Sequence, residues 1–226
     1  MTQTDTLSAA DALEAARKLY AAGRYGEAAQ AARAGLAAHP QDIGLLNLHA
    51  VLLRMQGDLA QALATLDRAL ALQPDHLNAL ANRANVLLDL GRGDDAAAVF
   101  RGLLARQPGH AGLQDGLARA LLKTGRREQA LRHMQQALTA DPSAVVAWRA
   151  LAADLSGEQD HDSAIEVLNQ GLTLSPNNPK LLEAKADILR ASRQLVRLEE
   201  FLVEQLVEQD SAWVHYQLGD LMTELR

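Results

Sequence analysis

The chain has 226 residues and no cysteine, and it carries a formal net charge of −6 with acidic and basic residues interspersed. The lack of cysteine excludes a disulfide framework and a thiolate zinc site. The mild negative charge, without a basic stripe, argues against nucleic acid as a partner.

The sequence also predicts no membrane partner. No apolar run approaches the length that a membrane-spanning helix needs. Residues 1–7 contain neither the basic residue nor the apolar core of a signal peptide. We therefore expect a cytoplasmic protein.

A period of thirty-four residues runs through the chain. It is clearest in one proline series: Pro40, Pro74, Pro108, Pro142 and Pro176. Leucine and alanine keep the same spacing, for example at Leu53 and Leu87 and at Ala50 and Ala84. A fixed period of this length indicates that one small structural unit is repeated.

Each period reads as two helices joined by a tight turn. In the period that begins at Ile43, apolar residues follow a helical stripe and end before Gly57, where glycine permits a sharp reversal. A second stripe starts near Ala62 and ends at Gln73, because Pro74 cannot continue a helix and disfavours helix in the preceding residue. The alanines allow the two backbones to approach closely.

In chain order, we expect an N-terminal tail (1–8) and then six helix pairs, at 9–42, 43–76, 77–110, 111–144, 145–178 and 179–211. Glycine occupies the turn in the first four pairs, whereas Gln159 and Arg193 stand there in the last two. Residues 212–226 read as one more helix, either a cap on the stack or the start of a seventh pair.

This pattern resembles the tetratricopeptide repeat, a thirty-four-residue motif with small residues in both helices and a closing proline. The resemblance implies an all-α solenoid of stacked antiparallel helix pairs, wound as a right-handed superhelix, with six repeats plus a C-terminal helix. The chain departs from the family pattern, because most positions where the family usually has a large aromatic residue hold leucine or alanine here.

In such stacks the first helix of each pair lines the concave side, so residues on that face are candidates for contacting a ligand. Projecting the pattern gives a peptide-binding groove of Asn47, Arg54, Asn78, Asn82, Asn85, Asp89, Asp115, Arg119, Lys123 and Arg149. The asparagines are the main signal, because an amide offers donors and an acceptor to the main chain of an extended peptide. The alternative for these asparagines and arginines is ordinary solvated surface.

Two aromatic residues near the end of the chain, Trp213 and Tyr216, are candidates for an anchor at the far end of the groove. Packing of the last helix is the competing interpretation of the pair.

No pattern of catalytic, metal or cofactor chemistry stands out. The seven histidines show no three- or four-residue helical spacing of paired metal ligands. The serines lie outside any nucleophile elbow, and the glycines are spread along the chain instead of clustered as a phosphate loop. We therefore expect a protein that is not an enzyme and needs no cofactor.

Two functions fit these observations. The first is a protein-interaction scaffold that holds an extended or helical segment of a partner protein in its concave groove. The alternative is the N-terminal substrate-recruitment part of a larger bacterial protein-modifying enzyme whose catalytic domain would follow Arg226. Similar arrays precede glycosyltransferases such as flagellin glycosyltransferases, sulfotransferases and 2-oxoglutarate oxygenases.

Overall fold

The computed structural model describes residues 8–208 and 211–225 of the chain. The expected N-terminal tail (1–8) therefore lies, except for Ser8, outside the described residues. Positions 209, 210 and 226 lie outside them as well.

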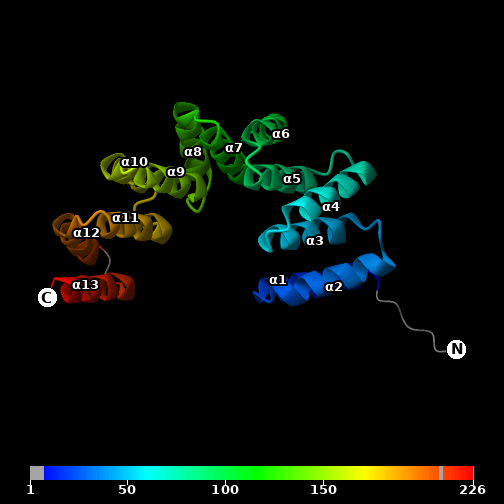
Figure 1. The fold of residues 1–226 in the computed structure, drawn as a ribbon, viewed down its shortest axis with the longest axis horizontal. Coiled ribbons are helices and arrows are strands. Elements are labelled where there is room, and N and C mark those ends of the chain that lie inside the picture. The colour runs from blue at the N-terminus through cyan, green and yellow to red at the C-terminus, as the bar shows by residue number, and fades with distance from the viewer. Residues whose placement is uncertain (1–7, 209–210, 226) are drawn as a thin grey trace. The chain divides into compact units, whose positions relative to one another are not determined.

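The described residues form thirteen α-helices and no strand (Figure 1). The helices are α1 Ala9–Ala21, α2 Tyr25–Ala38, α3 Ile43–Met55, α4 Leu59–Leu72, α5 Leu77–Asp89, α6 Gly93–Arg106, α7 Ala111–Lys123, α8 Arg127–Ala140, α9 Val146–Gly157, α10 His161–Leu174, α11 Pro179–Ala191, α12 Leu195–Glu208 and α13 Ala212–Glu224. The all-α fold class is thus confirmed.

The turn inside each pair depends on one residue with a left-handed backbone. Gly23, Gly57, Gly91 and Gly125 take φ angles of 73°, 82°, 75° and 74°. Gln159 (63°) and Arg193 (57°) adopt the same conformation in the last two pairs, where glycine is missing. This conformation is unfavourable for a residue with a Cβ atom, so these two turns carry local strain.

The helix starts are set by capping side chains. Asp42 accepts a hydrogen bond from the Leu45 amide at 2.8 Å at the start of α3, and Asp58, Asp160, Asn178 and Ser211 cap later helices in the same way. His76 and His110 accept through Nδ1 from the amides of Ala79 and Leu113. A cap satisfies one of the amide groups that have no partner in the first helical turn.

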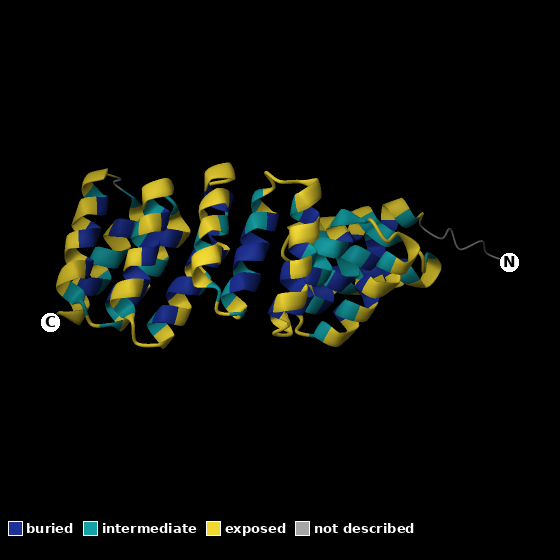
Figure 2. Cartoon of the chain, turned by 90° about the horizontal axis from the view of Figure 1, so that it is seen from above, coloured by how far each residue is buried: buried dark blue, intermediate teal, exposed yellow. Residues whose placement is uncertain are grey.

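The core lies between helices, on the faces that each helix turns toward its neighbours (Figure 2). The alanines of the first helices are at most 1% exposed: Ala16, Ala50, Ala84, Ala118, Ala152 and Ala186. The alanines of the second helices are fully buried: Ala28, Ala62, Ala96, Ala130 and Ala164. Small residues let the backbones approach, and leucines such as Leu66 fill the remaining space. Each fully buried leucine contributes roughly 1.5–3 kcal/mol.

Two close contacts involve a glycine and a large aromatic ring. A Cβ atom at Gly116 in α7 would lie 2.5 Å from the buried ring of Phe100 in α6. A Cβ atom at Gly171 in α10 would lie 3.3 Å from Trp148 in α9. Trp148 is fully buried and donates through its indole Nε1 to the Met134 carbonyl at 3.3 Å. The Phe100 ring takes space that only glycine leaves free, whereas the Trp148 ring packs tightly on Gly171.

The contacts divide the chain into two units, of which the first ends at Ala130 and the second begins at Leu131, within α8. In the first unit consecutive helices from α1 to α7 pack on one another, and α3 also contacts α5, as α5 contacts α7. In the second unit α9 to α13 pack consecutively, and α9 contacts α11. Within each unit the helices therefore pack mainly on their neighbours in sequence, as in a repeat array.

Candidate functional site

The candidate residues of the first unit gather on its first helices, α3, α5 and α7. Because these helices contact one another directly, their side chains meet across the helix boundaries. We call the surface that carries the resulting polar contacts the α3–α5–α7 face. It consists of Asn47, Arg54, Asn82, Asn85, Asp89, Asp115 and Arg119.

The first contact joins two of the predicted asparagines. The Asn82 amide nitrogen donates to the Asn47 Oδ1 at 2.9 Å, from α5 to α3. Both side chains are half-buried. The bond fixes how each carboxamide is turned, and it uses one of the two donors of Asn82.

The second contact is an ion pair between the same two helices. The Arg54 Nε lies 2.5 Å from the Asp89 Oδ2, with the two side chains 30% and 35% exposed. At this exposure water still screens the charges, so the pair orients the guanidinium more than it stabilises the fold.

The third contact continues from α5 to α7. The Arg119 Nη2 donates to the Asn85 Oδ1 at 2.6 Å, and the Arg119 Nε lies 3.2 Å from the Asp115 carboxylate one helical turn earlier. Asp115 is buried, with 7% of its surface exposed. The buried carboxylate of Asp115 compensates the positive charge of Arg119 and holds its guanidinium group in place.

Other candidates on the same helices make no such cross-helix contact in the described residues. Asn78 in the first turn of α5 and Lys123 in the last turn of α7 are exposed. Apolar side chains accompany them, since Val51 and Leu122 are partly buried and Met55 is 47% exposed. The surface thus combines oriented polar groups with small apolar contacts.

The remaining candidates belong to the second unit. Arg149 is exposed on α9, and on α13 Trp213 is half-buried whereas Tyr216 is 67% exposed. Their roles stay predictions.

Sequence reasoning missed that the polar candidates bind one another. The signal was present in the spacing. Asn47 and Asn82 are thirty-five positions apart, as are Arg54 and Asp89, which is one residue more than the repeat period. Residues about one period apart lie on neighbouring repeats and are therefore close in space. It also missed the capping role of His76 and His110 at the starts of α5 and α7.

One histidine of α3, near charged residues of α2 and α4, has a perturbed pKa. Burial lowers the pKa of the partly buried His49, and the charges of Arg33 and Arg68 lower it further. These surroundings favour the neutral imidazole over the cation.

Two other kinds of site are absent from the part of the chain that the structure describes. Among residues 8–208 and 211–225, no group of three or more histidine and carboxylate side chains is placed to hold a metal ion. Within the same ranges, none of the helices combines the length and apolar character required to cross a bilayer.

Comparison with known proteins gives matches at the level of family and fold. Family models described as tetratricopeptide repeat match residues 47–111, 87–155 and 145–188. No curated protein matches the sequence significantly.

Several solved structures share the fold. A thermophilic TPR protein from Thermus thermophilus, TTC0263, superposes with a TM-score of 0.66 at 22% identity and covers 80% of this chain and 99% of its own. MamA (41-end) from Desulfovibrio magneticus RS-1 gives 0.59 at 22% identity over 76% and 97% of the two chains. A chain of the APC/C hetero-tetramer Cut9-Hcn1 gives 0.66 at 19% identity and covers 95% of this chain and 43% of that one.

The family matches jointly span residues 47–188, and within them the structure shows helix pairs that turn at a left-handed residue and meet through buried alanines. The chain belongs to the tetratricopeptide repeat family.

Proposed function

We propose that this protein is an interaction scaffold that holds a segment of a partner protein on its α3–α5–α7 face. Stacked helical repeats are suited to this role because they present an extended surface whose side chains are free to vary without changing the fold. The Cut9-Hcn1 structure is a hetero-tetramer, and it is an example of a protein of similar fold that binds partners.

The observation that carries the proposal is the set of oriented polar groups on three adjacent helices. Asn47 keeps both amide hydrogens unused by the contacts of the described residues, and Asn82 keeps its Oδ1. One donor and one acceptor held side by side match the carbonyl and amide of an extended peptide. Because the orientation already exists, less side-chain freedom is lost on binding.

The charges on this face favour a segment of low charge. Arg54 is paired with Asp89 and Arg119 with Asp115, so neither arginine is available to an acidic ligand without breaking an internal pair. Val51, Met55 and Leu122 offer apolar contacts beside them. We therefore infer a largely uncharged ligand, bound through its main chain and small apolar side chains.

The test begins with peptides selected from a random display library against the whole protein. The selected peptides are then titrated by calorimetry into the wild type and into the double variant Asn47→Ala with Asn82→Ala. The double change removes both partners together, which avoids leaving one half-buried amide unpaired. We expect affinity to fall at least about tenfold, equivalent to 1.4 kcal/mol, with little change in melting temperature.

The matched control is Gln30→Ala, which removes an exposed amide from α2, a second helix of the same unit. It should leave affinity unchanged. Equal affinity of the wild type and the asparagine double variant for every selected peptide would refute binding at this face.

A further inference from the structure

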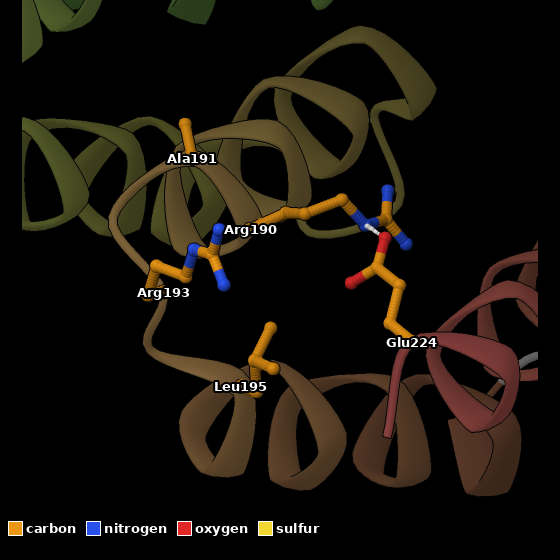
Figure 3. Close-up of a pocket in the computed structure, with 5 residues that line it drawn as sticks. All are labelled: Arg190, Ala191, Arg193, Leu195 and Glu224. Atoms are coloured by element: carbon orange, nitrogen blue, oxygen red, sulfur yellow. Dashed lines mark ion pairs between the residues drawn. The ribbon is translucent and has the colours of Figure 1, made fainter. Parts of the chain in front are cut away.

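A pocket of about 390 Å³ lies where α11 turns into α12, and it is lined by Arg190, Ala191, Arg193, Leu195 and Glu224. Its volume falls in the range of small-molecule sites. All lining residues belong to the second unit, so a ligand bound here is independent of the proposed peptide binding. In Figure 3 Arg190 extends from the end of α11 to the Glu224 carboxylate of α13, while Arg193 extends from the turn on the other side of the pocket.

Arg193 occupies the strained turn position with a φ of 57°. In four of the six helix-pair turns of the described residues this position holds glycine, which adopts the conformation at no steric cost. Gln159 shows that a strained turn alone does not mark a site. What distinguishes Arg193 is that its side chain lines a pocket to which a second arginine, Arg190, also contributes.

Arg190 is held in place without using its full hydrogen-bonding capacity. Its Nε lies 3.1 Å from a Glu224 carboxylate oxygen, and its Nη2 lies 4.0 Å from Asp220. Both nitrogens are buried, and neither has a hydrogen bond of good geometry within the described residues. Their burial beside the two carboxylates fixes the position of the Arg190 side chain at the edge of the pocket.

The charge balance of the pocket lining selects the sign and size of the ligand. Glu224 and Asp220 both lie within ion-pair distance of Arg190, whereas Arg193 has no ion pair within the described residues, so the free positive charge of the lining is that of Arg193. The Arg190–Glu224 pair shows that the site admits a carboxylate oxygen. Leu195 provides an apolar contact in the lining, so a short aliphatic chain attached to the anion gains contact area.

We propose that this pocket binds the carboxylate of a small organic monoanion, with Arg193 as the main ligand-binding residue, Arg190 as its support and Leu195 against the aliphatic part. A planar carboxylate fits the bidentate fork of arginine. Phosphate, with a second negative charge and no apolar part, would leave its extra charge beside Glu224 and the apolar contact unused.

The test uses three probes on the whole protein: N-acetyl-leucine, its amide, and inorganic phosphate. Binding is followed by calorimetry and by NMR of the arginine Nε–Hε signals. We expect saturable binding of N-acetyl-leucine with shifts of the Arg190 and Arg193 signals, no binding of the amide, and weaker binding of phosphate. Tighter binding of phosphate, equal binding of the amide, or no saturation below about 10 mM overturns the proposal.

The variant Arg193→Gly separates a binding role from a structural one. Glycine relieves the strained turn, so we expect a higher melting temperature together with at least a tenfold loss of affinity for N-acetyl-leucine. The matched control Gln159→Gly should raise the melting temperature by a similar amount and leave the affinity unchanged. Unaltered affinity in Arg193→Gly overturns the assignment.

Discussion

At the scale of single residues, close approach between helices decides which side chains are tolerated. Gly116 and Gly102 are both helical glycines of the first unit, yet only Gly116 faces a buried ring, that of Phe100. The two positions therefore respond oppositely to the same added methyl group.

We predict that Gly116→Ala destabilises the protein by about 1–3 kcal/mol, because its Cβ would overlap the Phe100 ring in a packed core. Gly102→Ala adds a methyl group where nothing lies within 4 Å, so it should stabilise the protein by about 0.5–1 kcal/mol through helix propensity. Denaturant unfolding of both variants measures the difference. Equal effects at the two positions would show that the α6–α7 contact is not tight.

The neutral state of His49 links stability to pH. Since its pKa is lower in the folded than in the unfolded protein, the unfolded chain takes up the proton first as pH falls. The contribution of His49 to the free energy of unfolding therefore declines from about pH 6.5 downward and levels off below the folded-state pKa.

We predict that His49→Leu gains stability relative to the wild type as the pH is lowered from 7.5 to 5. The reason is that the variant lacks the group whose protonation favours unfolding. Thermal unfolding at several pH values provides the measurement. Parallel pH profiles for the two proteins would contradict a lowered pKa of His49 in the folded protein.

At the scale of the element, helix starts and turns are determined by residues close together in sequence. The polar contacts between the first helices instead join residues that are far apart in sequence. Asp42 caps α3 through its own carboxylate, but Arg92 at the start of α6 makes no capping hydrogen bond with its side chain. Caps of the first kind could be read from residue type, since aspartate, asparagine and serine are the usual capping residues.

We predict that Asp42→Ala costs about 1 kcal/mol of stability, since the Leu45 amide loses its acceptor. Arg92→Ala is the matched control; it removes only an exposed ion pair with Asp95 and should change stability by less than about 0.5 kcal/mol. Urea unfolding distinguishes the two. A larger loss in Arg92→Ala than in Asp42→Ala would show that capping does not set the start of α3.

The links Asn47–Asn82, Arg54–Asp89 and Asn85–Arg119 belong to the element scale as well, because each joins one first helix to the next. Their members were predicted as face residues from helical projection alone. Their pairing was not, because projection places a residue on one side of its helix but says nothing about the rotamer that brings two side chains together.

At the scale of the whole molecule, packing is almost entirely between neighbours in sequence. Within the second unit α11 packs on α9, α10 and α12, whereas α13 packs on α12 and is tied to α11 by the Arg190 ion pairs. In repeat arrays, local unfolding begins at helices that contact few other helices.

We predict that native-state hydrogen exchange of α13 amides is at least about tenfold faster than that of α11 amides, because fewer contacts must open to expose them. Mass spectrometry of exchanged peptides from the whole protein provides the comparison. Equal protection of α11 and α13 would mean that the second unit opens only as a whole.

The sequence by itself determined the all-α class and the position of every turn, because its thirty-four-residue period places glycine, or Gln159 and Arg193 in its place, where the chain must reverse. It also predicted close packing at periodic alanines such as Ala50 and Ala62, which are fully buried. Only the tertiary structure decided that Asn82 binds Asn47, that Arg119 rests on Asp115, and that Arg190, Arg193 and Glu224 meet around a pocket. The physical reason is that periodicity specifies backbone position, whereas these contacts depend on the side-chain rotamers and helix packing that bring distant residues within hydrogen-bonding distance.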